Sequence, residues 1–568
     1  MEQNRKGVII IIRGTQTIVL CLLLYLAALD VDSSWSAAEH ILALVLPCSL
    51  LMCWIPYLVK CSAFSFKNID WLILGWGLME FVLFYTGQGN PVATACLRQV
   101  EMLCLYVLLR MLFSLRHISS DYISVGILLL ALYEIGLGVI QLISGTSRHA
   151  LYPVTGSFLN PGPYSAILAV AFGLCYAYCK KNKQNCWLVW LWKFILLSSL
   201  VMIAFTFSRA AMLAVACVVL MVNWQRLKKY WRWLPVPIAL AVVLYLMKSG
   251  SADGRLLIWN ISIRAIKEHF LVGGGLGCFP QAYADASVGY WPRNNWGYSV
   301  AGVCDNAFNE YLTLGVEQGI LGISLLLTVI CVAVRRLFVV ARPLCCGLVS
   351  LLVFAMFSYP FQLLPYRLLL VAMIAYSVSE SADRIAPARM SFYGVVVASV
   401  LVSAYSEGQI RSRVNAVEDY HGIEGIGSVN LLSDYYVLLP MLNDCPDFLF
   451  DFAKGLTSAK RYNDSNAMLQ QGTMVSADPM FYVCMGNNYS EMSLFKQAEE
   501  CYTHALKMVP NRLYPLYKLM KLYETCSNRD ACHRMARRVA AFREKVSSPA
   551  VREMKTEAKQ ICEQYEKR

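Results

Sequence analysis

Apolar runs long enough to cross a bilayer recur from the N-terminus to about Tyr405, and this feature constrains the fold most strongly. The bilayer core offers the backbone no hydrogen-bond partners, and spanning runs of about 20 apolar residues are typical of helices. Hydrophobic residues make up 57% of the chain and charged residues only 15%, which excludes an ordinary soluble enzyme. We therefore predict an all-α protein with a polytopic bundle of about 13 transmembrane helices.

Short polar breaks separate the expected spans. Their approximate limits are 15–30, 38–59, 70–87, 94–114, 121–144, 163–179, 187–206, 210–224, 233–247, 311–334, 344–360, 365–379 and 391–405. Lys and Arg gather in alternate loops, and the positive-inside rule makes those loops cytoplasmic, which also accounts for the net charge of +13. The same alternation places the loops at 145–162 and 248–310, and the tail after residue 405, on the outer side.

The composition changes after residue 405. We predict a polar linker at 406–430 and a domain of soluble amphipathic helices at 431–568. One set of residues has the spacing of a tetratricopeptide repeat: Tyr482, Met485, Gly486, Tyr489, Ala498, Tyr502, Ala505 and Pro510. A stable solenoid takes about three such units, so we expect two or three helix pairs and a capping helix.

The outer loop at 248–310 carries several motifs. The segment Asp253–Trp259 begins an expected interfacial helix, with Arg255 and Trp259 on one face. The run Gly273–Gly277 looks like a phosphate-binding glycine loop, but no Lys-Ser/Thr follows, which excludes a nucleotide P-loop and favours a tight turn. Cys278 and Cys304 can form a disulfide in an oxidising compartment. The cysteines and histidines lack the spacing of a zinc site.

Positive residues on the outer side oppose the positive-inside rule, so they are candidates for function. They are Arg148, Arg209, Arg255, Arg264, Lys267, Arg293 and Arg367. Together they suggest an anion site, although contact with lipid phosphates is the alternative for each of them. Within the fourth span, Arg98 and Glu101 lie on one helical face and predict an internal ion pair rather than a proton relay.

Five motifs in this order resemble the O-antigen ligase and O-antigen polymerase family of bacterial membrane glycosyltransferases. They are Asn160–Pro161, Ser208–Arg209, Arg255–Trp259, Gly273–Phe279 and Ala307–Gly322. The resemblance covers about residues 150–330 by motif and 1–405 by topology. It implies a polyprenyl-diphosphate-linked glycan donor and transfer to a glycan, to lipid A core or to a protein hydroxyl. It also implies a site on the periplasmic face of the inner membrane, with no metal, nucleotide or other cofactor and no nucleic acid.

One departure from the family concerns the general base. The family has a histidine in its last motif, where this chain has Phe308, whereas the flanking Asn309, Tyr311, Leu312, Glu317, Gly319 and Gly322 match. We expect Asp305 to replace that histidine as the base, with Glu310 and Glu317 as the next choices. His149 and His269 also belong to the expected outer loops and are further alternatives.

The resemblance suggests a metal-independent inverting transfer, in which the acceptor hydroxyl displaces the lipid diphosphate. Fixed guanidinium groups would then stabilise the leaving group most strongly. We expect Arg209 and Arg255 to act as catalytic residues together with Asp305. The expected substrate-binding residues are Arg148, Asn160, Arg264, Asn309 and Glu317.

Other functions stay open at this point. Ligase, polymerase and protein O-oligosaccharyltransferase differ in the acceptor, which the sequence does not identify. A polysaccharide transporter or a scaffold would explain the many spans, but would not need a long outer loop rich in arginines. A metal-dependent glycosyltransferase would use an acidic pair such as Asp30-Val-Asp32. We expect the repeat domain to recruit the acceptor or a protein partner.

Overall fold

A computed structural model describes residues 14, 17–28, 37–58, 64, 66–86, 92–114, 120–181, 187–227, 249–294, 296–379, 390–425, 431–543 and 548–566. The expected span at 233–247 and the Asp30-Val-Asp32 pair lie outside these residues. Within the described ranges the secondary structure is helical, and no strand occurs. The prediction of an all-α, polytopic helix bundle is confirmed.

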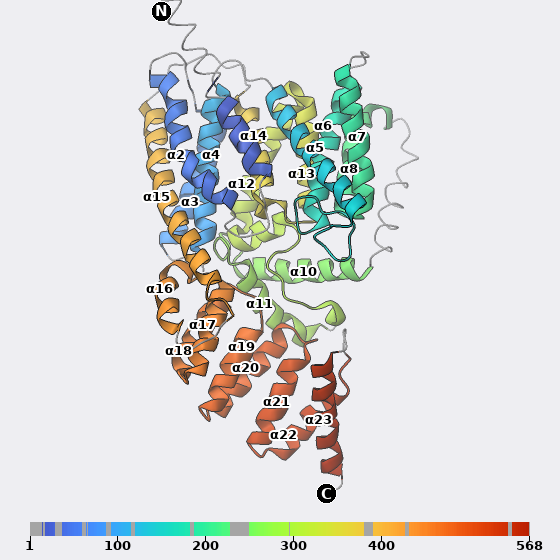
Figure 1. Cartoon of the computed structure of the whole chain (residues 1–568), viewed down its shortest axis with the longest axis vertical. Helices are drawn as coiled ribbons and strands as arrows, with labels where there is room; N and C mark the ends of the chain where they lie inside the picture. The colour runs from blue at the N-terminus through green and yellow to red at the C-terminus, as the bar shows by residue number, and fades with distance from the viewer. Residues whose placement is uncertain are drawn as a thin grey trace, which may run out of the picture.

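The bundle consists of apolar helices of different lengths that run side by side (Figure 1). They are the helix Thr17–Ala28, α2 (Ala37–Leu58), α3 (Asn68–Tyr85), α4 (Ala93–Ser114), α5 (Ser120–Ser144), α6 (Pro161–Lys181), α7 (Trp187–Thr206), α8 (Arg209–Leu227), α12 (Glu310–Val340), α13 (Arg342–Ala355), α14 (Leu364–Ser379) and α15 (Met390–His421). Five described helices are long and apolar enough to cross a membrane: α2, α5, α6, α7 and α12. Shorter apolar helices pack among them.

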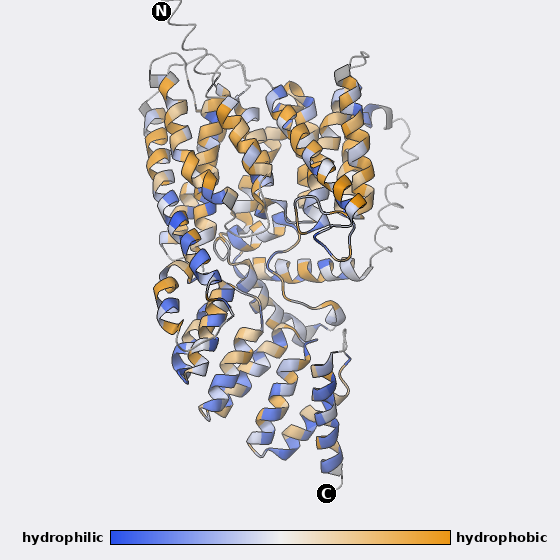
Figure 2. Cartoon of the chain, in the orientation of Figure 1, coloured by the Kyte–Doolittle hydropathy of each residue, from blue (hydrophilic) through white to orange (hydrophobic). Residues whose placement is uncertain are grey.

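The bundle helices are mainly hydrophobic (Figure 2), and many of their large apolar side chains are exposed, as expected for contact with lipid. Leu78, Ile140 and Leu401 are each more than half exposed. One buried charged side chain of the interior, Arg110, is paired. Arg110 donates to both carboxylate oxygens of Asp70, at 2.7 and 2.9 Å, as the high cost of an isolated charge in a membrane requires.

Two glycine segments interlock where the chain re-enters the bundle. Helix α12 is broken at Gly319, whose φ of 62° and ψ of −162° are not helical. The Gly274 and Gly275 N–H groups donate to the Val316 and Glu317 carbonyls, both at 2.9 Å. A Cβ at Gly273, where φ is +74°, would overlap the backbone of Glu317. The glycine run is therefore a tight turn that packs on the break in α12, and this contact fixes Glu317.

The segments predicted to face outward, residues 145–160 and 249–309, lie at one end of the bundle, and we call them the outer segments and this end the outer end (Figure 1). Helix α10 (Ser249–Glu268) lies across that end and continues to α11 (Phe279–Tyr290), η2 (Trp291–Arg293) and η3 (Tyr298–Val300). The loop between α5 and α6 is fixed beside them. Gln141 Oε1 accepts from the Thr155 and Gly156 N–H groups at 2.8 Å, and Glu134 accepts from the Ser157 hydroxyl at 2.6 Å.

The boundary between bundle and tail differs from the prediction. Helix α15 continues without a break to His421, so residues 406–421 of the expected linker are helical. The tail, defined as residues 431–568, contains α16 (Leu432–Leu442), α17 (Pro446–Ser458), α18 (Tyr462–Thr473), α19 (Met480–Glu491), α20 (Phe495–Met508), α21 (Leu513–Thr525), α22 (Arg529–Ala540) and α23 (Pro549–Glu566).

The tail helices stack in sequence order, each against the next (Figure 1). Helices α17, α19 and α21 begin at Pro446, Met480 and Leu513, which are 34 and 33 residues apart. The small residues singled out in the sequence lie between paired helices: Ala498 and Ala505 are fully buried, and a Cβ at Gly486 would meet the Tyr502 ring. The interval and the packing support the repeat assignment, which remains a proposal.

The tail packs against the outer segments. Ala284 of α11 packs in one cluster with Ala477, Met508 and Val509 of the tail. The Tyr298 hydroxyl donates to the Pro510 carbonyl at 2.6 Å, and Asn511 Nδ2 donates to the Ala301 carbonyl at 2.9 Å. Tail and outer segments therefore share one end of the molecule.

Two local predictions need correction. Cys278 and Cys304 are both buried free thiols, so the suggested disulfide is absent. Arg98 forms an ion pair with Glu39 of α2 at 3.4 Å, whereas the carboxylate oxygens of Glu101 find no hydrogen-bond partner among the described residues. The spacing on α4 could not reveal a partner on another helix.

Candidate functional site

A cavity of about 190 Å³ at the outer end of the bundle contains both arginines predicted to bind the leaving group. We call it the arginine cavity; its lining includes Tyr152, Asn160, Phe207, Arg209, Ser251, Arg255, Phe308 and Tyr359. Three separate segments supply the key groups: the loop before α6, the break between α7 and α8, and α10. Arg209 Nη2 donates to the Ser251 hydroxyl at 3.3 Å, which joins the α8 and α10 sides.

The charge balance of the arginine cavity is positive. None of the described residues that line it carries a carboxylate. Burial, and then the positive charge of Arg209, lower the pKa of Arg255 below its ordinary value. Arg255 makes no ion pair within the described part of the chain; its guanidinium carbon lies 5.7 Å from the centre of the Phe308 ring. Two neighbouring guanidinium groups in a cavity whose described lining has no carboxylate favour a bound anion.

Backbone strain also concentrates at this cavity. Phe207 and Phe308 have φ values of 51° and 49°, in the left-handed region that bulky residues rarely adopt. The other described non-glycine residues with positive φ, Lys460, Ser493 and Ser527, lie in turns of the tail. Strain of this kind costs about 1–3 kcal/mol per residue and clusters at functional sites. Phe308, at the expected histidine position, also contacts the Tyr359 ring edge-on at 5.5 Å.

A second cavity, of about 460 Å³, contains the predicted base. We call it the carboxylate cavity; its lining includes Ala95, Arg98, Gln99, Pro280, Asp305, Glu310, Thr313, Glu317, Gln362 and Arg367. Glu310 is buried and accepts from the Phe361 N–H at 2.6 Å. Arg367 is buried and forms an ion pair with Glu39, but its Nε finds no hydrogen-bond partner among the residues described. Carboxylates, amides and guanidinium groups therefore all face one space.

Asp305 lines the carboxylate cavity and is exposed. Partial burial, and then the negative charges of Asp478 and Asp447 in the tail, raise the pKa of Asp305 above its ordinary value. A raised pKa suits a group that must accept a proton near neutral pH. The segment 305–309 contributes to both cavities, because Asp305 lines one and Phe308 lines the other.

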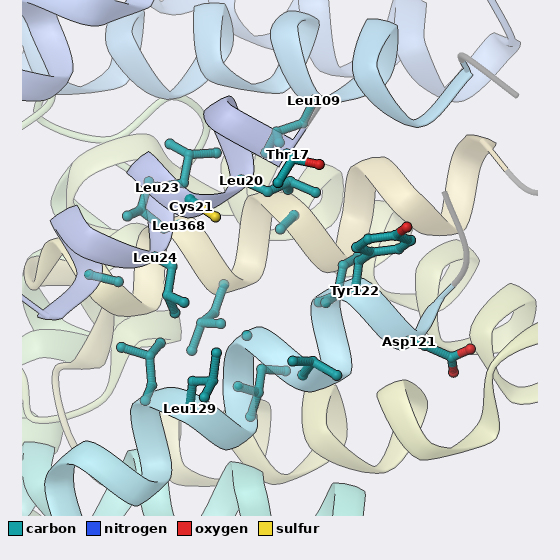
Figure 3. A pocket seen from close by; sticks show the side chains of 18 of the residues that line it. Thr17, Leu20, Cys21, Leu23, Leu24, Leu109, Asp121, Tyr122, Leu129 and Leu368 are labelled. Carbon is teal, nitrogen blue, oxygen red and sulfur yellow. The ribbon is translucent and has the colours of Figure 1, made fainter. Parts of the chain in front are cut away.

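Other cavities are mainly apolar. One of about 250 Å³ adjoins the carboxylate cavity and shares part of its lining: Gln99, Met102, Glu310, Thr313, Glu317, Phe361 and Arg367. The rest of its lining is mainly apolar and comes from α3, α4, α12 and α14. Another of about 370 Å³ lies between the helix Thr17–Ala28, α5 and α14 (Figure 3). Most of the side chains that line it are aliphatic, although Thr17, Cys21, Asp121 and Tyr122 also belong to the lining.

The structure separates the predicted site residues into three groups. Asn160, Arg209 and Arg255 meet in the arginine cavity, and Asp305 and Glu317 meet in the carboxylate cavity. Three other predicted binding residues line neither cavity. Arg148 donates to the Ser157 carbonyl at 2.9 Å, Arg264 pairs with Glu268 at 4.0 Å, and the Asn309 side chain caps the N-terminus of α12.

Sequence reasoning missed several lining residues. Tyr152 and Tyr359 stand in irregular loops, where no periodic pattern marks them. The sequence predicts Arg98 to pair with Glu101 within one helix, and it predicts Arg367 to be one of several cations on the outer side. Their shared partner Glu39 lies far away in the sequence, so only the fold reveals their meeting. The alternative bases His149 and His269 line neither cavity.

The segment that contains both predicted catalytic arginines is similar to a known protein family. Residues 194–327 match the family model described as O-antigen ligase. The match runs from α7 into α12 and includes Arg209, Arg255, Asp305 and Phe308. A comparison with curated proteins gives no match.

Proposed function

Because residues 194–327 carry an O-antigen ligase domain, we propose that this chain is a membrane glycosyltransferase that takes its glycan from a polyprenyl-diphosphate carrier. The observation that carries the proposal is the meeting of Arg209 and Arg255 in a cavity whose described lining contains no carboxylate. A diphosphate offers several anionic oxygens, and planar guanidinium groups bind such oxygens in pairs. Asn160, Tyr152 and Tyr359 add polar groups at the same cavity.

The proposed reaction is a single displacement. The acceptor hydroxyl oxygen forms a bond to the anomeric carbon while the bond from that carbon to the diphosphate oxygen breaks. The bonding electron pair leaves with the diphosphate, and Arg209 and Arg255 stabilise the charge that develops there. The acceptor proton passes to Asp305. Attack opposite to the leaving group inverts the anomeric configuration, and the two guanidinium groups supply the positive charge without a metal.

The arrangement of the two cavities supports these roles. The donor diphosphate occupies the arginine cavity, and the base approaches from the carboxylate cavity across the segment 305–309. Phe308 cannot exchange a proton, so a base in the second cavity explains how this chain functions without a histidine there. Glu310 and Glu317 lie in the same cavity and are the next candidates.

We also propose the cellular setting. The basic loops make the opposite end of the bundle cytoplasmic, so both cavities and the tail face the periplasm of a bacterial inner membrane. The chain then divides into a ligase-like membrane domain at 1–405 and a tetratricopeptide-like domain at 431–568. A protein O-oligosaccharyltransferase would use the same donor site, and disruption of the gene separates these cases. Accumulation of lipid-linked polymer would indicate a ligase. Loss of long glycan chains with retention of single repeat units would indicate a polymerase, and loss of glycans from proteins would indicate an oligosaccharyltransferase.

Binding of undecaprenyl diphosphate to the purified chain in nanodiscs tests the donor site. We expect Arg209→Ala and Arg255→Ala each to weaken this binding at least about tenfold, since each removes charge-assisted hydrogen bonds. Arg411→Ala is the matched control, because it removes an exposed guanidinium of α15 that lines neither cavity. Equal affinity in all three variants and the wild type would refute the proposed donor site.

A further inference from the structure

A further cavity, of about 190 Å³, lies between α3, α4 and α15 near the outer end of the bundle. We call it the Glu80 cavity. Gly77, Glu80, Phe81 and Phe84 line it from α3, and their spacing of three or four residues places them on one face of that helix. Both α3 and α15 pack against α4, and Leu276 of the glycine run also lines the cavity. The cavity is thus formed by the sides of three helices and by an outer segment.

Glu80 is a buried carboxylate that lacks a counter-ion. It is only 5% exposed, and its Oε1 finds no hydrogen-bond partner among the described residues. No other described residue that lines the cavity has a charged side chain. Asp70 on the same helix is different, because the buried Arg110 pairs with it. A buried carboxylate without a partner is costly in a membrane protein, so Glu80 marks a site for a ligand that donates hydrogen bonds.

The mouth of the Glu80 cavity opens to the surface of the bundle. Phe81, Tyr85 and Tyr405 line the cavity, and each of them is at least half exposed. Val402, one turn before Tyr405 on α15, also lines it and is exposed. Tyr85 is the last residue of α3, so this mouth lies at the outer end of that helix. Aromatic side chains at such an end are typical of the level of the lipid headgroups.

The groups that line the cavity suit an ammonium ion. A primary ammonium donates three hydrogen bonds, which Glu80, the Ser406 hydroxyl and the Gln409 amide oxygen can accept. The rings of Phe84 and Tyr405 add surfaces that attract cations. A divalent metal ion needs several oxygen ligands, and the described residues contain no group of three or more acidic, histidine or cysteine side chains that could hold one. An anion would be repelled by the Glu80 carboxylate.

We propose that the Glu80 cavity binds the headgroup of a phospholipid that carries a primary ammonium. The ammonium donates to Glu80 between the aromatic side chains, the phosphate stays at the mouth, and the acyl chains lie along the exposed apolar sides of α3 and α15. The site does not depend on glycan transfer. Gln99 and Leu276 line both this cavity and the carboxylate cavity, so the bound lipid adjoins the carboxylate cavity without entering it.

Native mass spectrometry of the purified full-length chain in mixed micelles measures this binding. The probes are dioleoyl phosphatidylethanolamine, its N-methyl and N,N-dimethyl derivatives, and dioleoyl phosphatidylcholine. We expect the ethanolamine lipid to bind at one site at least about tenfold more tightly than the choline lipid, because choline has no N–H to donate to Glu80. Affinity should fall along the methylation series. Equal affinity for the ethanolamine and choline lipids would overturn the proposal.

Two variants test the place of the site. Glu80→Gln keeps the size of the side chain and removes its charge, and it should weaken binding of the ethanolamine lipid at least about tenfold. Val402→Trp fills the mouth from an exposed position and leaves Glu80 unchanged, and it should weaken binding as well. Wild-type affinity in either variant would overturn the proposal. The methylation series uses the wild-type chain and therefore decides the question even where a variant does not fold.

Glu418→Gln is the matched control. It removes an exposed carboxylate of α15 that lines none of the cavities described above. We expect Glu418→Gln to bind the ethanolamine lipid as the wild type does. Weaker binding in Glu418→Gln would show that surface charge attracts the lipid, and it would overturn the assignment to the cavity.

Two further probes identify the source of the ammonium. Free ethanolamine in excess should not displace the lipid, because it lacks the acyl chains that lie against α3 and α15. Displacement would show that the site takes a soluble amine, and it would overturn the lipid assignment. Dioleoyl phosphatidylglycerol has headgroup hydroxyls but no cation and should bind no better than the choline lipid. Binding of the glycerol lipid as tight as that of the ethanolamine lipid would overturn the ammonium assignment.

Discussion

Substitution of Gly273 by alanine tests how the outer segment is joined to the membrane bundle. Gly273 has a φ of +74°, and a Cβ there would overlap the backbone of Glu317 and Gln318. Neither obstacle is a flexible side chain, so the two segments must separate. Separation breaks the hydrogen bonds from Gly274 to Val316 and from Gly275 to Glu317, both 2.9 Å long.

The loss of stability in Gly273→Ala can be worked out from the backbone strain and the two hydrogen bonds. A left-handed φ costs a residue with a Cβ about 1–3 kcal/mol, and the two hydrogen bonds contribute about 0.5–1.5 kcal/mol each. Gly273→Ala should therefore lose about 2–6 kcal/mol of local stability. Because the same contact fixes the backbone of Glu317, which lines the carboxylate cavity, transfer should also fall.

The assay is the fraction of detergent-solubilised protein that stays monodisperse after heating, followed by glycan transfer. Gly302→Ala is the matched control: its Cβ would meet nothing within 4 Å, and its φ is not left-handed. We expect Gly302→Ala to behave as the wild type and Gly273→Ala to aggregate at lower temperature. Equal stability and equal transfer in both variants would refute the interlocked glycine contact.

Four further predictions concern the site. Arg255→Ala should lower transfer by about 10²–10³-fold, and Arg255→Lys should also fail because an ammonium cannot bind two oxygens in one plane; near-normal transfer in reconstituted membranes would exclude this role. Asp305→Asn should cost at least about tenfold in rate, whereas Phe308→His should be neutral or mildly harmful; a silent Asp305→Asn would mean that leaving-group stabilisation alone carries catalysis. Burial and the charges of Asp478 and Asp447 raise the pKa of Asp305, so transfer should be lost on acidification at a higher pH than an ordinary aspartate would give. Asp447→Asn removes one of those charges, lowers that pKa and should move the acid limb of the pH–rate profile to lower pH; an unmoved limb would argue against Asp305 as the base. Deletion of residues 431–568 should leave binding of undecaprenyl diphosphate intact and lower transfer to the native acceptor, and loss of donor binding would show that the bundle depends on the tail.

Sequence patterns predicted the parts of the fold that repeat. The apolar runs of membrane length correspond to helices of the bundle, and the polar break at Ser208–Arg209 corresponds to the boundary between α7 and α8. The polar composition after residue 405 was misleading. Helix formers such as Glu407, Gln409 and Arg411 continue α15 into solvent, so a change in polarity marked the end of the membrane segment and not the end of the helix.

The candidate site was predictable only in part. The sequence predicts that Arg209 and Arg255 act together, because both belong to polar segments expected on the same side of the membrane. The two arginines do line one cavity. The three-residue interval from Asp305 to Phe308 did not reveal that they face different cavities. The turn between them depends on the left-handed backbone of Phe308, which no residue preference predicts.

Contacts between distant segments were beyond sequence reasoning. Glu39 on α2 binds arginines from α4 and α14, and Asp478 of the tail acts on Asp305 of the outer segment. Such pairs depend on how the helices pack against one another, which cannot be predicted from residue spacing or from amino-acid composition.

The central claim is that the chain transfers glycan by displacing a lipid diphosphate held by Arg209 and Arg255. The most direct measurement uses the purified full-length chain in proteoliposomes, with lipid-linked glycan donor, native membrane acceptor and a metal chelator. We expect free polyprenyl diphosphate to appear in step with glycosylated acceptor, and both products to disappear in Arg255→Ala. Glycan that crosses the membrane still attached to its carrier, with no diphosphate released, would contradict the claim and indicate a transporter.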